Sequence, residues 1–297
     1  MVETIKTDYV IIGSGSAGST IAYRLAEKTN SQISVIEFGG SDKSPIIQMP
    51  AALSMPMNMK KYNWGYNTLP EKFLNNRQLA CPRGKVIGGS SSINGMIFVR
   101  GNAHDFDAWD KSGAKGWSYS DVLPYFKKME TFHGNMSEWR GNDGPMHVSR
   151  AKGFNPLYKA FLNSSLEAGY NHLKDYNGFQ QEGFGFADMT VWKGRRWSAA
   201  NAYLHPAIKK GNTKIYTKTL VDKIIFEGKI AREVECIQNG RKIRFKANFS
   251  IILCAGAIGS PLILQRSGIG SSDDLKRYGI DIIENRPGVG HNLQDHL

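Results

Sequence analysis

The sequence predicts an α/β fold that begins with a complete β-α-β unit. The short apolar run 8–12 is typical of a buried strand, and a glycine-rich turn, Gly13–Gly18, follows it directly. Apolar residues at helical spacing come next, and a second apolar run at 33–36 ends beside Glu37. A strand, a tight glycine turn, a helix and a second strand in this order are typical of a Rossmann-like sheet.

The composition is that of a globular protein with a basic surface. Of the 297 residues, 41% are hydrophobic and 22% are charged, and the formal net charge is +12. The length suits one large domain or two ordinary ones. The basic residues come as scattered pairs rather than as one dense stripe, so we expect no nucleic-acid partner, while weak attraction to anionic lipid stays open. The pairs are Lys60–Lys61, Lys127–Lys128, Arg195–Arg196 and Lys209–Lys210.

The three cysteines, Cys81, Cys236 and Cys254, lie far apart, which favours reduced thiols over a disulfide framework. Neither they nor the seven histidines show metal-ligand spacing, so we expect no metal site. The polar N-terminus does not resemble a signal peptide, and no segment has the apolar length of a membrane span. We therefore expect a cytoplasmic protein, with a peripheral position on the inner membrane left open.

The turn at 13–18 has the spacing Gly-x-Gly-x-x-Gly, in which each glycine has a physical role. Gly13 allows the tight turn, Gly15 lets a diphosphate approach the backbone, and Gly18 lets helix and strand pack closely. Amides at the helix start bind the diphosphate, and Glu37 accepts hydrogen bonds from ribose hydroxyls. A glycine turn without a ligand and a solvated carboxylate are the alternatives. The predicted dinucleotide contacts here are Gly13, Ser14, Gly15, Ser16, Ala17, Gly18 and Glu37.

Beyond residue 40, the apolar pattern predicts a mixture of helices and strands. Residues 41–80 are irregular, and residues 117–132 predict a helix. The expected buried face of that helix is Trp117, Val122, Leu123, Phe126 and Met129. An amphipathic helix carries Leu157, Phe161 and Leu166. Strands are expected at 214–217, 221–227, 230–237, 241–246 and 249–253, and a helix at 260–266.

Two long motifs carry a family resemblance. The first runs from Gly84 to Asn94 and on to Phe98, Gly101 and Asp107, and the second is the stretch 256–270. Both resemble the signatures of the glucose–methanol–choline (GMC) oxidoreductases, and the resemblance continues through 287–296. It implies FAD as the cofactor and a discontinuous FAD-binding domain at 1–155 and 212–297. The segment 156–211 is then the first part of an α+β substrate domain.

The resemblance also implies which residues surround the flavin. It places Val86, Gly89, Asn94, Gly95 and Met96 around FAD and Val221, through its backbone, at the adenine. Glycines permit close approach of the ring to the backbone, and hydroxyls such as that of Ser90 can donate to the phosphates or the ring edge. Some family members carry a histidine covalently linked to the flavin where this chain has Asn94, so we expect non-covalent FAD.

Two further stretches, 177–185 and 194–206, look like those of choline dehydrogenases, although family members that act on other aliphatic alcohols carry variants of them. The implied reaction converts choline to betaine aldehyde. A trimethylammonium group favours aromatic faces and a nearby carboxylate. Trp64, Trp192, Trp197 and Glu182 are candidates for that role, with packing or surface positions as the alternative.

In the family, the alcohol proton passes to a histidine while a hydride passes to flavin N5. The resemblance puts that histidine in a C-terminal part beyond residue 297, so no catalytic residue is expected in this chain. We assign neither His291 nor His296 as the base. The expected partners are a small alcohol and an electron acceptor such as a membrane quinone. An inactive FAD-binding fragment and a nicotinamide-dependent dehydrogenase are the competing hypotheses.

Overall fold

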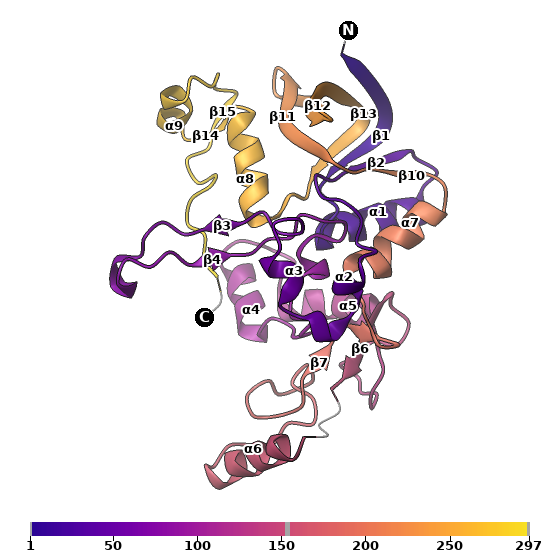
Figure 1. The fold of residues 1–297 in the computed structure, drawn as a ribbon, viewed down its shortest axis with the longest axis vertical. Coiled ribbons are helices and arrows are strands. Elements are labelled where there is room, and N and C mark those ends of the chain that lie inside the picture. The colour runs from indigo at the N-terminus through magenta and orange to yellow at the C-terminus, as the bar shows by residue number, and fades with distance from the viewer. Residues whose placement is uncertain (1, 152–154, 296–297) are drawn as a thin grey trace. The chain divides into compact units, whose positions relative to one another are not determined.

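The computed structural model describes residues 2–151 and 155–295 and divides into two compact units (Figure 1). The first unit comprises Met1–Gln48, Ala52–Asn94 and Ser198–Leu297, and the second comprises Met49–Ala51 and Gly95–Trp197. The predicted boundaries near residues 155 and 211 separate a cofactor-binding domain from a substrate domain. The compact units do not show which part binds cofactor or substrate, so this domain assignment stays a prediction.

The first unit is built on a six-stranded sheet with the strand order β10-β2-β1-β13-β12-β11. Four strands are parallel: β10 (Thr213–Tyr216), β2 (Ile33–Ile36), β1 (Glu3–Ile12) and β13 (Arg241–Leu253). The hairpin of β11 (Thr219–Glu227) and β12 (Ile230–Gln238) extends them antiparallel. The expected α/β class is confirmed, and β2 has the predicted bounds.

The predicted strands at 241–246 and 249–253 are one continuous strand, β13. It pairs with β1 from Ile243 to Leu253, and the register shifts between Thr7 and Tyr9. The irregularity lies beside residues 247–248, where the two predicted strands were divided. The prediction of two strands was therefore wrong, because the long partner β1 keeps β13 extended.

Alternating side chains of the central strands enter two hydrophobic clusters on opposite faces of the sheet. Ile11 packs with Ala22 and Ala26 of α1 (Ser16–Lys28), and Ala207 of α7 (His205–Lys209) joins the same cluster. Val10 and Ile12 instead belong to the cluster that includes Ile263 of α8 (Gly256–Arg266). Helices thus cover both faces of the parallel strands, as a doubly wound sheet requires.

Residues 41–80, expected to be irregular, form short elements. They are α2 (Pro45–Gln48), the 3₁₀ turns at Pro50–Ala52 and Lys72–Leu74, α3 (Met55–Asn58), and β3 (Tyr66–Asn67), which pairs with β4 (Ala80–Cys81). Another 3₁₀ turn covers Gly89–Ser92, and a π-helix covers Ala200–Leu204. Near the C-terminus, α9 (Ser272–Arg277) accompanies β14 (Ile269–Gly270) and β15 (Glu284–Asn285).

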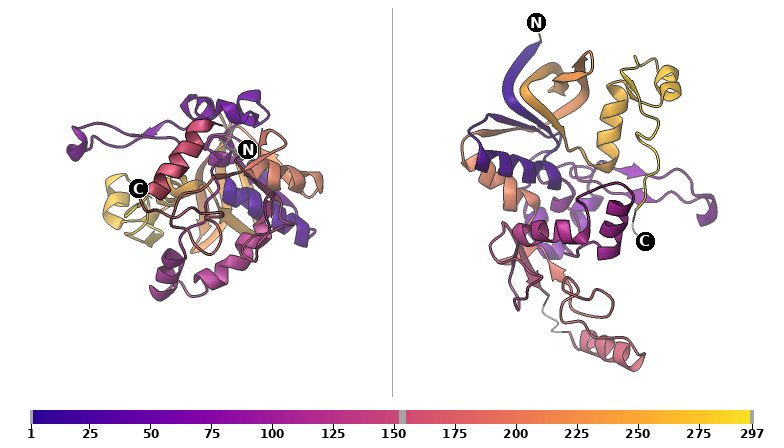
Figure 2. Two further views of the ribbon diagram at one scale, coloured as in Figure 1. Left: turned by 90° about the horizontal axis from the view of Figure 1, so that it is seen from below. Right: turned by 180° about the vertical axis from the view of Figure 1, so that it is seen from behind.

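In its described residues, the second unit carries three helices and two small sheets. Figure 2 shows the chain from two further sides. The helices are α4 (Ala103–Lys111), α5 (Tyr119–Met129) and α6 (Pro156–Glu167). The strands are β5 (Glu130–Phe132), β6 (Met146–Arg150) and β7 (Asp188–Met189) in one sheet, and β8 (Val191–Trp192) with β9 (Arg195–Arg196) in the other.

Three expectations for this unit need correction. Helix α4 was not predicted, and the helix expected at 117–132 ends at Met129, where the chain enters β5. Trp117 is 52% exposed rather than buried, because it precedes the helix and packs edge-on against Trp109. Val122, Leu123, Phe126 and Met129 are half-buried. Across the described ranges, no helix is long and apolar enough to cross a membrane.

Candidate functional site

A cavity of about 710 Å³ lies in the first unit at the carboxyl ends of β1, β2 and β13. Doubly wound sheets bind ligands at this edge, and the volume is that of a ligand site. The cavity walls are mostly apolar, with a few polar groups between them. Its lining residues lie within the segments 12–17, 36–38, 64–66, 83–90, 219–222 and 253–266, together with Ile237, although not every residue of these segments reaches the cavity.

The glycine turn after β1 forms part of this wall because only glycine fits there. Gly13 has φ +99°, and a Cβ on it would lie 2.4 Å from the carbonyl oxygen of Cys254. A Cβ on Gly18 would lie 1.9 Å from the carbonyl oxygen of Gly13. The roles expected of these two glycines, a tight turn and close packing of helix on strand, agree with these contacts.

A second glycine loop packs against the first, backbone to backbone. A Cβ on Gly89 would lie 2.7 Å from the Cα of Gly15, and the Gly88 amide donates to the Ser14 carbonyl oxygen at 3.0 Å. A Cβ on Gly84 would lie 2.2 Å from the Gly89 carbonyl carbon. The glycine motifs at 13–18 and 84–94 are far apart in the sequence, but together they make one continuous wall.

Glu37 ties the first loop to the end of β2. Its Oε2 accepts from the Ser14 amide at 3.1 Å and from the Ser14 hydroxyl at 2.8 Å, and its Oε1 accepts from the Gly39 amide at 2.7 Å. Burial raises the pKa of this carboxyl, and the hydrogen bonds from Gly39 and Ser14 oppose the shift. The carboxylate thus braces the loop in addition to lining the cavity.

Helix α1 presents its N-terminus to the cavity. Gly15 is its cap residue, and Ser16 and Ala17 of its first turn line the wall. Within the described chain, its first turn holds neither a capping side chain nor an acidic residue. The first backbone amides of a helix lack intrahelical acceptors and favour an anion. This end of the cavity is therefore suited to a phosphate group.

The structure brings most of the predicted cofactor residues together. Those that line the cavity are Gly13, Gly15, Ser16, Ala17, Glu37, Gly89, Ser90 and Val221. Ser14 and Gly18 are buried directly behind the wall, and Val86 is buried among Ile47, Tyr62 and Ile93. Asn94 is exposed at the end of the first unit, whereas Gly95 and the buried Met96 belong to the second.

One wall of the cavity is aromatic, which the sequence did not predict. Phe38 stacks on Trp64 with ring centroids 5.1 Å apart, and Trp64 stacks on Tyr66 at 6.0 Å, with all three rings at the lining. The alternate spacing of Trp64 and Tyr66 is a strand signal that places both rings on one side. Flat apolar rings in the same cavity wall as the Glu37 carboxyl suit a planar heterocycle.

The candidate residues for a trimethylammonium site occupy different surroundings. Trp64 lines the cavity of the first unit, and Glu182 is exposed in the second. Trp192 stacks on His133 with ring centroids 3.6 Å apart, and the Lys193 ammonium lies 5.8 Å from the Trp192 centroid. A ring already engaged by an imidazole and a resident cation is a poor site for another cation.

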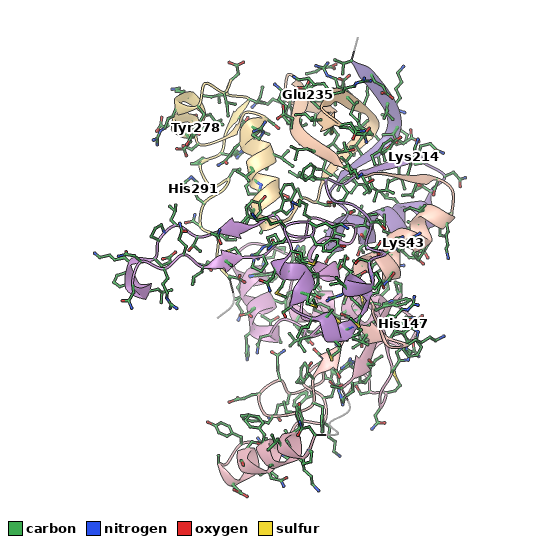
Figure 3. All side chains as sticks on the ribbon, viewed as in Figure 1. Lys43, His147, Lys214, Glu235, Tyr278 and His291 are labelled. Atoms are coloured by element: carbon green, nitrogen blue, oxygen red, sulfur yellow. The ribbon has the colours of Figure 1, made fainter. Side chains whose placement is uncertain are left out.

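Trp197 belongs to the same aromatic cluster as Trp192. Its ring meets that of His147 edge-on at 4.9 Å, and its indole N–H donates to the Pro145 carbonyl oxygen at 2.8 Å. These contacts favour the packing alternative for Trp197. His147, labelled in Figure 3, lies on β6 within this cluster.

His291 and His296 remain unassigned as the catalytic base. The Nε2 of His291, also labelled in Figure 3, lies 3.6 Å from Oδ2 of Asp274 in an exposed pair. His296 lies outside the described residues. Over the ranges the structure describes, no three or more His, Cys, Asp or Glu side chains cluster as metal ligands would.

A family model described as GMC oxidoreductase matches residues 7–297. Oxygen-dependent choline dehydrogenases from Sinorhizobium fredii (strain NBRC 101917 / NGR234) and from Rhizobium etli (strain ATCC 51251 / DSM 11541 / JCM 21823 / NBRC 15573 / CFN 42) are 54% and 55% identical, over 99% of this chain and 53% of each relative. The chain therefore spans about half the length of the curated relatives it matches.

Two solved structures share the fold of this chain over nearly its whole length. Pyridoxine 4-oxidase from Mesorbium loti superposes with a TM-score of 0.92 at 34% identity, over 97% of this chain and 57% of that chain. Formate oxidase from Aspergillus oryzae RIB40 superposes with a TM-score of 0.91 at 28% identity, over 100% of this chain and 53% of that chain.

Proposed function

The chain belongs to the GMC oxidoreductase family, and from this premise we propose that it forms the FAD-binding part of an alcohol-oxidising enzyme. GMC oxidoreductases are FAD flavoproteins. When bound, FAD supplies the hydride acceptor, flavin N5. The proposed substrate is choline, which loses a hydride and a proton to become betaine aldehyde.

The observation that carries the cofactor assignment is the wall made by the two glycine loops. Gly15 and the first amides of α1 would hold the diphosphate, because these amides lack intrahelical acceptors and line the cavity at a turn without side chains at Gly15 and Gly89. The remaining acceptor capacity of Glu37 would receive a ribose hydroxyl, and the backbone near Val221 would meet the adenine. The residues present therefore fit the group.

The other predicted cofactor residues remain part of this proposal. Because the Val86 side chain is fully buried, we assign its contact to the backbone. Asn94, Gly95 and Met96 follow from the family resemblance. With an amide at residue 94, the flavin is held non-covalently.

Support for choline comes from the two choline dehydrogenases at 54% and 55% identity. Another aliphatic alcohol is the alternative substrate. The proposed acceptor is a membrane quinone, reached from a cytoplasmic, peripheral position. Oxygen is the alternative acceptor, because the relatives are named oxygen-dependent choline dehydrogenases.

A second candidate function is FAD binding without turnover. What supports it is that the predicted cofactor residues line the cavity, whereas none of the described residues is assigned as the proton acceptor. The family's proton-accepting histidine belongs to a part of the fold outside this match, according to the resemblance. Binding and turnover therefore need separate tests.

The binding test is a titration of FAD with the chain, followed through quenching of flavin fluorescence. We expect saturable binding that ADP displaces, since ADP carries the adenine, ribose and diphosphate. Binding of NAD in preference to FAD would refute the flavin assignment and support a nicotinamide-dependent enzyme.

The turnover test is anaerobic addition of choline to the FAD-loaded chain. Bleaching of the visible flavin absorbance by choline supports the full proposal, and bleaching only by another alcohol supports the alternative substrate. Stable FAD binding with no bleaching by any alcohol leaves the second candidate function. Reoxidation by a quinone analogue or by oxygen then distinguishes the acceptors.

A further inference from the structure

Strand β11 closes one end of the six-stranded sheet, and its only strand partner in the described chain is β12. The backbone groups along its other edge therefore need hydrogen-bond partners from side chains or water. Helix α8 lies beside this strand (Figure 1), and its Ile263 belongs to the same core cluster as Ile224 of β11. The side chains at the end of α8 are thus in reach of the edge of β11.

A β-bulge interrupts β11 at Asp222. Val221 pairs with Cys236 and Lys223 pairs with Glu235, so Asp222 is an extra residue without an opposite residue on β12. A bulge takes its extra residue out of the ladder, and next to a binding site it aims a neighbouring residue. The neighbour here is Val221, which lines the cavity together with Asp222.

Arg266, the last residue of α8, holds the bulge through two groups of Asp222. Its Nε donates to the Asp222 carbonyl oxygen at 2.9 Å, and its Nη2 donates to the Asp222 carboxylate. The guanidinium is planar and its N–H groups have fixed directions, so a contact at two points fixes the orientation of Asp222. Arg266 also lines the cavity.

A serine makes a second link between the same two elements. The Ser267 hydroxyl accepts from the Ile224 amide at 2.8 Å and donates to the Ile263 carbonyl oxygen at 2.6 Å, in a buried position. Ser267 follows Arg266 directly, and Ile224 lies two residues after Asp222. Ser267 therefore anchors β11 to α8 in the core, while Arg266 fixes the bulge at the cavity.

An arginine in a cavity wall could instead bind a phosphate of the ligand. The Arg266 guanidinium is already engaged by Asp222, whose carboxylate repels a phosphate placed beside it. The first backbone amides of α1 supply a phosphate site in the same cavity. These contacts favour a role of Arg266 in positioning the strand.

We propose that Arg266 is a positioning residue for the adenine of the bound dinucleotide. It fixes Asp222 in the bulge, and the bulge aims the backbone of Val221 into the cavity. The inference rests on the proposed function, in which this backbone meets the adenine of FAD. Binding of adenine-bearing ligands then depends on Arg266, whereas binding of the phosphates alone does not.

The test uses three probes that separate the parts of the cofactor. ADP carries adenine, ribose and diphosphate, adenosine carries no charge, and pyrophosphate carries no adenosine. Calorimetry measures ADP and pyrophosphate binding, and saturation-transfer NMR measures adenosine binding. Arg266→Leu should bind ADP and adenosine about tenfold more weakly than the parent chain. Arg232→Leu is the matched control and should bind all three probes as the parent does, because Arg232 pairs with Glu227 at the far end of β11.

The double variant Arg266→Leu/Asp222→Asn separates positioning from charge. Arg266→Leu alone leaves an unpaired carboxylate, which weakens the binding of any anion. The double variant removes one positive and one negative charge, so it should bind pyrophosphate as the parent chain does, which also shows that it is folded. Its binding of ADP and adenosine should stay about tenfold weaker. Parental affinity of the double variant for adenosine and ADP would overturn the proposal, because charge alone would then explain the single variant.

Asp222→Asn tests the alternative that Arg266 binds phosphate. This substitution keeps the shape of the side chain, so it remains informative if Arg266→Leu fails to fold. We expect weaker binding of ADP and adenosine. Tighter binding of ADP and pyrophosphate would overturn the proposal, because it would show that Arg266, once released from the carboxylate, binds the ligand itself.

A failure of the cofactor assignment gives a different result. A parent chain that binds neither FAD nor ADP would contradict the proposed function and, with it, the role of Arg266. A parent chain that binds both, combined with equal adenosine affinity of Arg266→Leu and Arg232→Leu, would overturn the role of Arg266 alone.

Discussion

At Gly89, the backbone of one cavity loop touches that of the other. Its φ is +55°, and a Cβ would lie 2.7 Å from the Cα of Gly15, which cannot move aside because it caps α1. Gly228 has a similar φ of +60°, but among the described residues no heavy atom would lie within 4 Å of a Cβ there. Both positions therefore require a positive φ, but only at Gly89 would a Cβ meet neighbouring backbone atoms.

We therefore predict that Gly89→Ala costs about 1–3 kcal/mol more folding free energy than Gly228→Ala, the usual range for overpacking. Urea unfolding measures this difference, and FAD titration should show weaker binding only for Gly89→Ala. Equal effects of the two substitutions would mean that the loops can separate without cost.

Glu37 accepts hydrogen bonds that an amide can only partly replace. In Glu37→Gln, one terminal atom becomes a donor, so either the Ser14 or the Gly39 amide loses its acceptor. We predict a loss of about 1–3 kcal/mol in the free energy of unfolding, as expected for a buried unsatisfied group. We also predict weaker ADP binding by isothermal calorimetry. Glu27→Gln, on the exposed side of α1, is the control and should change neither value.

His133 and His147 form a pair that depends on pH. Nε2 of His133 lies 2.8 Å from Nδ1 of His147, a bond that needs one unprotonated nitrogen. Burial lowers the pKa of both, and His133 and Lys193 lower that of His147 further. Because both pKa values fall on folding, the neutral pair stabilises the fold fully above the ordinary pKa of 6.5. That stability is lost as the pH falls through the lower folded values.

We predict that stability falls on acidification from about pH 7.5 to about pH 5 and that His147→Gln reduces this loss. Thermal unfolding at several pH values is the measurement. His104→Gln, an exposed histidine of α4, should keep the parental pH dependence. An unchanged pH dependence in His147→Gln would contradict the role of the pair.

Among the elements, β13 holds the sheet of the first unit together. It joins the parallel strands, through β1, to the antiparallel β12, and its Phe245 is fully buried in the core cluster below α8. Phe249 lies on the same strand but is 66% exposed. The strand thus contains one buried and one exposed copy of the same side chain.

We predict that Phe245→Ala lowers the free energy of unfolding by about 3–5 kcal/mol, the usual cost of emptying a buried aromatic site. Phe249→Ala should cost less than about 1 kcal/mol, because it removes only a surface contact with Tyr9. Denaturant unfolding of both variants makes the comparison, and similar losses would place β13 outside the core.

In the whole molecule, the second unit relies on buried charges where the first relies on an apolar core. Arg140 is fully buried and lies 2.8 Å from carboxylate oxygens of Glu130, Asp175 and Asp188. Arg100 and Arg150 complete the network. Removing one member leaves buried carboxylates without compensation.

We predict that Arg140→Leu destabilises the second unit by about 3–5 kcal/mol. Hydrogen exchange followed by mass spectrometry should show lost protection in peptides from 95–197, while β1, β2 and β13 remain protected. Arg232→Leu, which removes an exposed ion pair with Glu227 in the first unit, should have little effect. Equal loss of protection in both units would show that they unfold together.

The sequence by itself determined the α/β class, the bounds of β2, the positions of the two glycine loops and the family. Local rules suffice for these features, because strand and helix periodicity and the glycine requirement of a tight turn act over a few residues. The helix of 260–266 was likewise predicted and begins slightly earlier, at Gly256.

Only the tertiary structure decided the continuity of β13, the exposure of Trp117 and the aromatic wall of Phe38, Trp64 and Tyr66. Two of these depend on neighbours far away in the chain, because β1 keeps β13 extended and Phe38 stacks on Trp64. The same holds for Glu37, whose expected ribose contact is joined by hydrogen bonds to Ser14 and Gly39. Periodicity fixes which face of an element is apolar, but packing of distant segments decides what that face meets.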